Sequence, residues 1–268
     1  MNHSASNPSQ SKASAFVGGG LVGTLGGLIG LGGAEFRLPL LIGFYRFAAL
    51  EAVILNKAMS LVVVAFALPF RTQAVPVAQV LSHWPVILNL LAGSLIGAWC
   101  GASWATRMRS DLLYRIIAIL LVGMAVVLWT SHGAGSHQAL LQPGPVQIAG
   151  GVVAGFAIGV VAAVMGVAGG ELLIPTLTLL FGVDLKLAGS LSLAISLPTM
   201  LAAFARYSRD QSFSVLVRHR GFAGLMAAGS IVGAYLGGLL LGIVPTGLLL
   251  PLLAAILLIS AVKVWRHK

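Results

Sequence analysis

Charged residues are scarce in this sequence, and acidic residues are the scarcest of all. Charged side chains make up 8% of the 268 residues, with 6 Asp and Glu against 16 Lys and Arg, whereas 58% of the residues are hydrophobic. A soluble domain carries roughly 25% charged residues, because its surface must be solvated. The composition therefore excludes an ordinary soluble globular protein.

Cysteine is nearly absent as well. The single cysteine, Cys100, excludes an internal disulfide and a cysteine-rich metal site. It lies within an apolar run, where we expect a small buried hydrophobic residue. Motifs for nucleotide binding or for a metal centre are missing too. We therefore expect no cofactor, no metal and no catalytic residue, and we predict that the protein is not an enzyme.

Long apolar runs dominate the rest of the chain. Many approach the ~20 residues that a helix needs to cross the hydrocarbon core of a bilayer, and the alternating pattern of a membrane barrel is missing. The sequence thus predicts an all-α polytopic membrane protein in contact with lipid. The net charge of +10 does not indicate nucleic acid, because the basic residues lie in short loops, where they set membrane topology.

One polar stretch occurs twice, as "GLGGAEFRLPLL" (30–41) and "GVAGGELLIPTL" (166–177). At one constant spacing, Gly, Gly, Glu, Pro and Leu of the first copy recur in the second, and the match continues without a gap into the next apolar segment. Shared apolar composition does not align Glu with Glu and Pro with Pro in a chain with 6 acids and 11 prolines. This pattern indicates an internal duplication.

The duplication divides the chain into a first repeat (14–130), a linker (131–145) and a second repeat (146–268), preceded by an N-terminal tail (1–13) that we expect to be disordered. Each repeat has about five apolar segments, the second of them short. If all segments cross the membrane, nearly all Lys and Arg lie on the side of both termini, which is then the cytoplasm. We predict two inverted-topology repeats with about ten segments in the plasma membrane, the inner membrane of a bacterium. The predicted segments are 14–30, 35–45, 50–70, 84–105, 111–130, 146–166, 171–181, 187–205, 220–241 and 244–263.

Paired short segments that follow glycine-rich interruptions are typical of transport sites. A helix that begins near Ala34 or Gly170 presents unpaired main-chain amides and a positive dipole end, which suit an anion. Pro39 and Pro175 are predicted about one turn into these helices, where they help to define the helix start. The glycines that interrupt the preceding helices are Gly30, Gly32, Gly33, Gly166, Gly169 and Gly170.

Glycines also line close helix contacts, so a packing seam is the alternative for the duplicated motif. For "GSLIG" (93–97) and "GSIVGAYLGG" (229–238), which lack the duplicated acid and proline, packing is the expected role.

Glu35 and Glu171 are the two acids of the duplicated motif. An acidic side chain at membrane depth is costly and commonly functional. We expect the two to serve proton coupling or gating. The alternatives are a carboxylate that only stabilises a first helical turn and a ligand for a transported cation.

Further polar residues in the short segments and in the segments after them complete the predicted substrate site. A hydroxyl in this set can also hydrogen-bond its own helix. Lys57 must snorkel, pair with Glu35 or Glu51, or meet the substrate. Besides Ala34 and the glycines, the predicted substrate-binding residues are Arg37, Asn56, Lys57, Ser60, Ser190, Ser192 and Ser196.

The two motifs, each followed by an Ala/Ser/Leu-rich helix ("AVILNKAMSL" and "AGSLSLAISL"), resemble the sulfite exporter TauE/SafE family, also called the toluene sulfonate uptake permeases. The resemblance covers both halves and implies secondary transport of sulfite, an organosulfonate or a related anion. The family commonly has a fuller glycine triplet and a Thr-Ser-Leu, where this chain has Gly32-Gly33-Ala34 and Leu55-Asn56-Lys57.

We therefore predict a secondary transporter for a small sulfur-containing anion that works by alternating access. A cation transporter that uses Glu35 and Glu171 as ligands, or a membrane protein without transport activity, is the alternative. The expected partners are the anion and the bilayer, with a homodimer left open and no nucleic acid.

Overall fold

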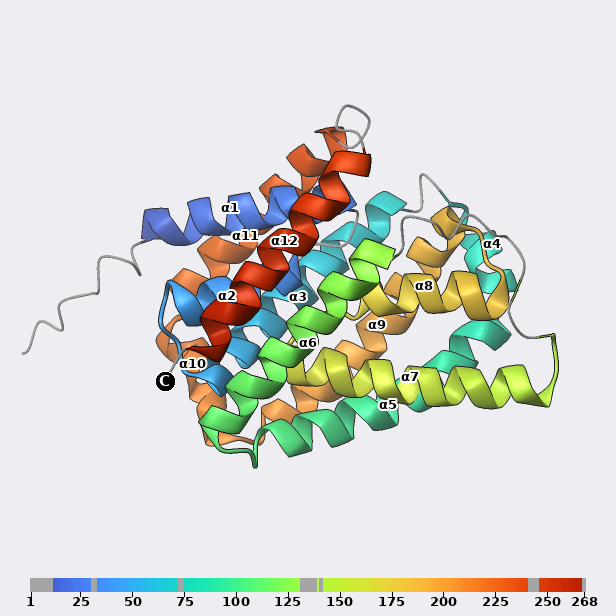
Figure 1. The fold of residues 1–268 in the computed structure, drawn as a ribbon, viewed down its shortest axis with the longest axis horizontal. Helices are drawn as coiled ribbons and strands as arrows, with labels where there is room; N and C mark the ends of the chain where they lie inside the picture. The colour runs from blue at the N-terminus through green and yellow to red at the C-terminus, as the bar shows by residue number, and fades with distance from the viewer. Residues whose placement is uncertain are drawn as a thin grey trace, which may run out of the picture.

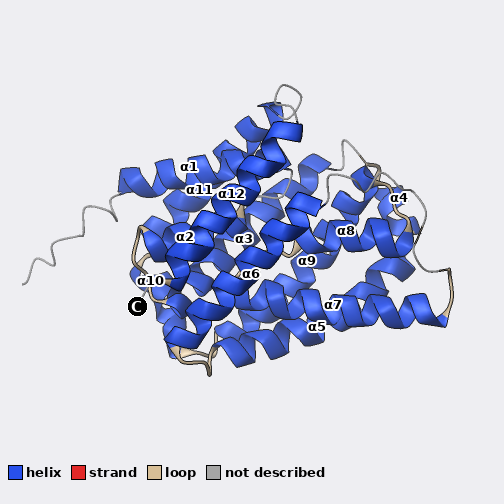
Figure 2. Ribbon diagram, viewed as in Figure 1, coloured by secondary structure: helices blue, strands red, loops and turns tan. Residues whose placement is uncertain are grey.

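The structure is a computed structural model, and it describes residues 12–29, 33–71, 75–130, 139, 142–240 and 246–266. Every regular element within these ranges is a helix (Figure 2). The elements are α1 (Lys12–Ile29), α2 (Ala34–Gly43), α3 (Ala49–Arg71), α4 (Val77–Ser82), α5 (Trp84–Ala105), α6 (Ser110–Thr130), α7 (Pro145–Met165), α8 (Gly170–Phe181), α9 (Leu185–Tyr207), the 3₁₀ turn η3 (Gln211–Ser214), α10 (Val215–Arg218), α11 (Arg220–Leu240) and α12 (Thr246–Trp265).

Each apolar segment predicted from the sequence corresponds to one long or medium helix, with ends that differ by a few residues. The helix α1 begins at Lys12, within the predicted tail, whereas most of the linker 131–145 and the glycines at 30 and 32 lie outside the described residues. The short elements α4, η3 and α10 were not predicted. They lie in the connections before α5 and α11, where no long apolar run marks them.

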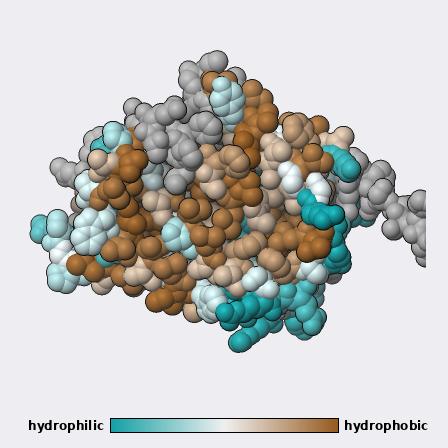
Figure 3. All heavy atoms as spheres, turned by 180° about the vertical axis from the view of Figure 1, so that it is seen from behind, coloured by the Kyte–Doolittle hydropathy of each residue, from teal (hydrophilic) through white to brown (hydrophobic). Residues whose placement is uncertain are grey.

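Four of the described helices are long and apolar enough to cross a membrane. The spans are Ala49–Phe66 in α3, Trp84–Ala105, Pro145–Met165 and Leu187–Tyr207 in α9. Much of the face drawn in Figure 3 is hydrophobic, and hydrophilic residues gather towards its edges. A soluble globular protein does not expose an apolar surface of this extent. The molecule is therefore a multi-pass membrane protein.

The helices α3 and α9 occupy the centre of the molecule. Their spans are each 61% buried inside the protein, against 39% for α5 and 44% for α7. Around them, α1 packs along α11, α5 along α7 and α6 along α12, so each of these pairs joins the two halves of the chain (Figure 1). The short helices α2 and α8 pack against α3 and α9, respectively.

Glycines allow the close approach of α5 to α7 and of α1 to α11. A Cβ atom at Gly97 would collide with the main-chain carbonyl of Phe156, and one at Gly233 would collide with that of Gly20. The packing role predicted for 93–97 and 229–238 is thereby confirmed for these glycines. Cys100, by contrast, is exposed on α5. The prediction of a buried cysteine is wrong, because the outward face of a membrane helix is as apolar as its inward face.

Candidate functional site

The helices α2 and α8 begin in the same way, with the same sequence pattern and the same main-chain conformation. The residue before α2 is Gly33, with φ 72°, and the residue before α8 is Gly169, with φ 83°. Both values lie in the left-handed region, which glycine adopts without steric cost. At Gly33 a Cβ atom would also collide with the carbonyl of Val22. The helix starts predicted at Ala34 and Gly170 are confirmed.

The prolines of the motif lie a little more than one turn into these helices, close to the predicted position. Pro39 and Pro175 are inside α2 and α8, where the expectation that the missing N–H costs little is wrong. At this position a main-chain N–H would normally bond the carbonyl four residues earlier, which belongs to Glu35 or Glu171, respectively. Proline has no N–H to donate. The prolines therefore do not mark the helix start but deprive the two glutamate carbonyls of that bond.

Side chains from α3 and α9 donate hydrogen bonds to main-chain carbonyls at the C-terminal end of α7 and just after it. The Lys57 Nζ donates hydrogen bonds to the carbonyls of Ala162 (2.7 Å) and Val167 (2.6 Å). The Tyr207 hydroxyl donates to the carbonyl of Ala163 at 3.0 Å. The main-chain amides of Gly166 and Val167 also bond the Ala163 and Ala162 carbonyls, and a cation near the last carbonyls of a helix is favourable. Lys57 thus caps α7.

Asn56 connects this helix end to the start of α2. Its side-chain amide donates to the carbonyl of Ala34 at 3.0 Å and to that of Met165 at 3.1 Å. The Ser60 hydroxyl, one turn further along α3, lies 3.5 Å from the carbonyl of Gly166. A Cβ atom at Gly166, where φ is 69°, would collide with the carbonyl of Val53 on α3. The start of α2 and the C-terminal end of α7 therefore meet at α3.

Arg37 completes this cluster from α2. Its Nη1 atom donates to the Asn56 Oδ1 at 3.4 Å and to the Ser60 Oγ at 3.2 Å. The residues at the matching positions of Arg37 and Lys57 in the second repeat are Leu173 and Leu193. The structure therefore brings together Arg37, Asn56 and Ser60, which were predicted for the substrate site. Both buried bases, Arg37 and Lys57, come from the first half of the chain.

The serines of α9 are buried but form fewer contacts. Ser192 donates to the carbonyl of Gly189 at 2.9 Å within its own helix. The hydroxyls of Ser190 and Ser196 are buried and have no hydrogen-bond partner within the described ranges. Such buried hydroxyls are unusual, because leaving them unpaired costs free energy.

Glu35 and Glu171 lie in contact, and their side chains are within hydrogen-bonding reach of each other. Both are buried, at 0% and 6% exposure. Apart from this contact and each residue's own main-chain amide, no hydrogen-bond partner occurs for the four carboxyl oxygens among the residues the structure describes. The two equivalent acids of the duplicated motif thus meet.

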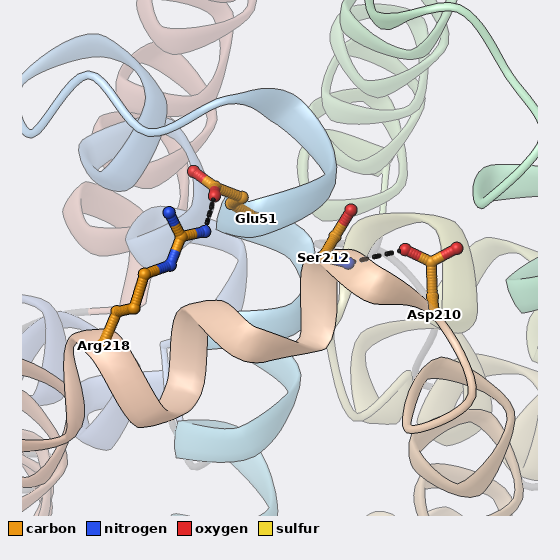
Figure 4. A network of polar contacts seen from close by, with 4 residues as sticks. All are labelled: Glu51, Asp210, Ser212 and Arg218. Carbon is orange, nitrogen blue, oxygen red and sulfur yellow. Dashed lines mark hydrogen bonds and ion pairs between the residues drawn. The ribbon is translucent and has the colours of Figure 1, made fainter.

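Glu51, one of the two acids considered as a partner of Lys57, has another partner. Its carboxylate forms an ion pair with the exposed Arg218 of α10 at 2.6 Å (Figure 4). In the same connection the Asp210 carboxylate accepts a hydrogen bond from the main chain of Ser212 at 2.9 Å. The ion pair fastens the connection between α9 and α11 to the start of α3.

Tyr207 is the residue of this site that the sequence analysis missed. It is fully buried at the end of α9 and bonds the end of α7. A tyrosine at the end of an apolar segment usually indicates a membrane interface, so the sequence has no signal for this long-range contact. The buried pair of Ser94 and Thr199, whose hydroxyls lie 2.7 Å apart between α5 and α9, was missed for the same reason.

The sequence model of the family described as sulfite exporter TauE/SafE matches residues 15–264. The chain belongs to this family. No curated protein and no solved structure matches it. Because the TauE/SafE match runs through both halves, it includes the two helix starts and the cluster around Arg37. TauE/SafE proteins are membrane transporters, in agreement with the four long apolar helices.

Proposed function

We propose that this protein is a secondary transporter that carries a small sulfur-containing anion, such as sulfite or an organosulfonate, across the plasma membrane. The observation that carries the proposal is the buried guanidinium of Arg37, held by Asn56 and Ser60 beside the start of α2. Arginine suits planar recognition of oxyanions, because its N–H groups form a fixed fork.

The two helix starts supply a second group of donors. In α2 the amides of Phe36 and Arg37 bond the carbonyl of Gly33, and in α8 those of Leu172 and Leu173 bond the carbonyl of Gly169. The amides at the very start of each helix have no partner within the helix. Together with the positive dipole ends they favour an anion, and the buried hydroxyls of α9 are further candidate donors.

The lengths of α2 and α8 support a site at membrane depth. The two helices have 10 and 12 residues, and a helix rises about 1.5 Å per residue, so each is roughly half as long as the hydrocarbon core is thick. If their outer ends lie at the membrane surface, their starts lie near its middle. Main chain interrupted at such a depth is tolerated where protein or a water-filled cavity surrounds it.

The helix contacts support two inverted repeats with about ten membrane segments. The sequence relates α1 to α7, α5 to α11, α3 to α9 and α6 to α12. If each helix is replaced by its equivalent in the other repeat, the contact of α1 with α11 becomes the contact of α7 with α5, which is also present. The pairs of α3 with α9 and of α6 with α12 each join two equivalent helices and stay the same. We propose that one repeat rocks against the other for alternating access, with both termini in the cytoplasm.

The contact between Glu35 and Glu171 favours one further candidate function, the transport of a cation bound by the two carboxyls. Among the described residues no group of three or more His, Cys, Asp or Glu could hold a metal ion. Replacing either acid with Gln abolishes binding in a cation carrier, whereas an anion carrier still binds its substrate.

A thermal-shift screen of the purified protein against sulfite, sulfate, thiosulfate and sulfonates tests the proposal. A ligand that binds the folded state raises its apparent stability by mass action. We expect stabilisation by at least one of these anions and flux of that anion into proteoliposomes. If none binds and none is transported by the folded protein, the proposed function is wrong.

A further inference from the structure

Four charged side chains are buried in the described part of the protein: Glu35, Arg37, Lys57 and Glu171. They come from the starts of α2 and α8 and from the middle of α3. Arg37 acts electrostatically on Glu35, and Lys57 acts on Glu171. Each of the two acids, which contact each other, therefore lies near one of the two bases.

A hydrogen bond between two carboxyl groups needs a proton on one of them, because an ionised carboxylate can only accept. Two carboxylates in contact also repel each other, and the repulsion grows where water is excluded. The four carboxyl oxygens of Glu35 and Glu171 are buried and have no other side-chain hydrogen bonds in the described ranges. Their contact therefore implies at least one proton on the pair.

Few other ionisable groups face this pair. The helix α7 has none, and the other helices packed against α2 and α8 have theirs near the helix ends, apart from Lys57. Those with described side chains are Lys12 on α1, Glu51 on α3, Asp111, Tyr114 and Arg115 on α6, Arg206 and Tyr207 on α9, and Lys263 on α12.

The formal charges of the buried cluster can be counted for each protonation state of the pair. With one proton, the acids contribute one negative charge and the bases two positive charges. The helix ends do not change this count, because the positive starts of α2 and α8 offset the negative ends of α1 and α7. The cluster then has a net charge of about +1, which a singly charged anion neutralises.

We propose that Glu35 and Glu171 share one proton and that this proton gives the buried cluster the single positive charge that selects a singly charged oxyanion. This inference rests on the proposed function, since it names the charge class of the same substrate and the group that couples its binding to protons. Loss of the shared proton leaves the cluster neutral and weakens anion binding. A second proton raises its charge and admits a doubly charged anion.

Two probes separate these cases, because methanesulfonate is singly charged and sulfate is doubly charged around neutral pH. Calorimetric titrations of the full-length protein, in two buffers with different ionisation enthalpies, measure affinity and proton uptake together. We expect methanesulfonate to bind more tightly than sulfate near neutral pH. In the pH range where the pair loses its shared proton, the affinity for methanesulfonate should fall as the pH rises. In the same range, the protein should take up as much as one proton for each anion that binds.

Glutamine variants test whether the pair is responsible. In Glu35→Gln or Glu171→Gln the remaining carboxylate accepts a hydrogen bond from the new amide, so the pair keeps one negative charge without a shared proton. We expect methanesulfonate binding to persist and to depend less on pH than in the wild type. In the double variant the pair is neutral, and the ratio of sulfate to methanesulfonate affinity should rise by at least about tenfold. Glu51→Gln, which removes an acid outside the cluster, should leave both properties unchanged.

An infrared measurement tests the shared proton without any ligand. The wild-type protein should show the carbonyl stretch of a protonated carboxylic acid, and either single Gln variant should lose it. If that band is missing, if the single variants keep the wild-type pH dependence, or if the double variant gains no sulfate affinity, the inference is wrong. In these cases methanesulfonate binding still supports the proposed function, whereas a folded wild type that binds neither probe nor sulfite contradicts that function itself.

Discussion

Arg37 is the buried cation on which the proposed anion site depends. Hydrogen bonds to a charged group contribute about 1.5–3 kcal/mol, which corresponds to roughly 10- to 100-fold in affinity. We expect Arg37→Gln to weaken anion binding by this factor while the protein stays folded, as measured by calorimetric titration. Arg218→Gln, which removes an exposed arginine from the ion pair with Glu51, is the matched control and should bind as the wild type does. Equal affinities for the two variants would exclude Arg37 from the site.

Lys57 is expected to stabilise the fold more than it binds substrate. Its hydrogen bonds go to the Ala162 carbonyl, which also accepts from the Val167 amide, and to the Val167 carbonyl just after α7. A hydrogen bond from a charged group contributes about 1.5–3 kcal/mol. Lys57→Met should therefore lower the thermal unfolding temperature clearly, whereas Lys12→Met, at the exposed start of α1, should not. An unchanged unfolding temperature in Lys57→Met would show that the caps at the end of α7 contribute little.

At the scale of single residues, the sequence indicated which charged side chains are buried. It did not indicate which groups they bond. The acids and Arg37 were identified because charged residues are rare in apolar segments. That Lys57 bonds the end of α7, and that Tyr207 joins it, could not be predicted. Both contacts link residues more than forty positions apart, and the sequence does not indicate which helix end an ammonium reaches.

At the scale of the elements, Gly33 determines where α2 can begin. An alanine in the left-handed region costs roughly 1–2 kcal/mol, and here its Cβ atom would also collide with the carbonyl of Val22. We expect Gly33→Ala to reduce thermal stability and anion binding. Gly224→Ala, on α11, adds a Cβ atom with no neighbour within 4 Å and should be neutral or slightly stabilising. A Gly33→Ala protein that binds and unfolds like the wild type would contradict this role.

The helices themselves were largely predictable. The span of α5 matches the predicted segment 84–105, and α8 begins at Gly170, where a helix start was predicted. Runs of apolar residues bounded by Gly, Pro or charge give this accuracy, because each must cross the same apolar layer. The connecting helix α4 has no such constraint. That Pro39 leaves the Glu35 carbonyl without its helical partner depends on the exact start of α2, which the sequence marks only through Gly33.

At the scale of the whole molecule, inverted repeats place equivalent connections on opposite sides of the membrane. Leu81 of α4 and Val217 of α10 are exposed, at 62% and 72%, and they lie in equivalent connections. In a Cys100→Ser background, we expect an impermeant thiol reagent to label Leu81→Cys from outside intact cells. It should label Val217→Cys only after the membrane is opened. Labelling of both from one side would contradict the inverted arrangement.

The proposed site exists only at this scale, since it is made by two helix starts that lie far apart in the sequence and meet around α3. A structure of the purified protein with bound methanesulfonate or sulfite, determined by electron cryo-microscopy, tests that claim most directly. We predict density for the anion beside Arg37, at the starts of α2 and α8. Density for the anion at another place in the protein, with these two helix starts packed as they are here, would contradict it.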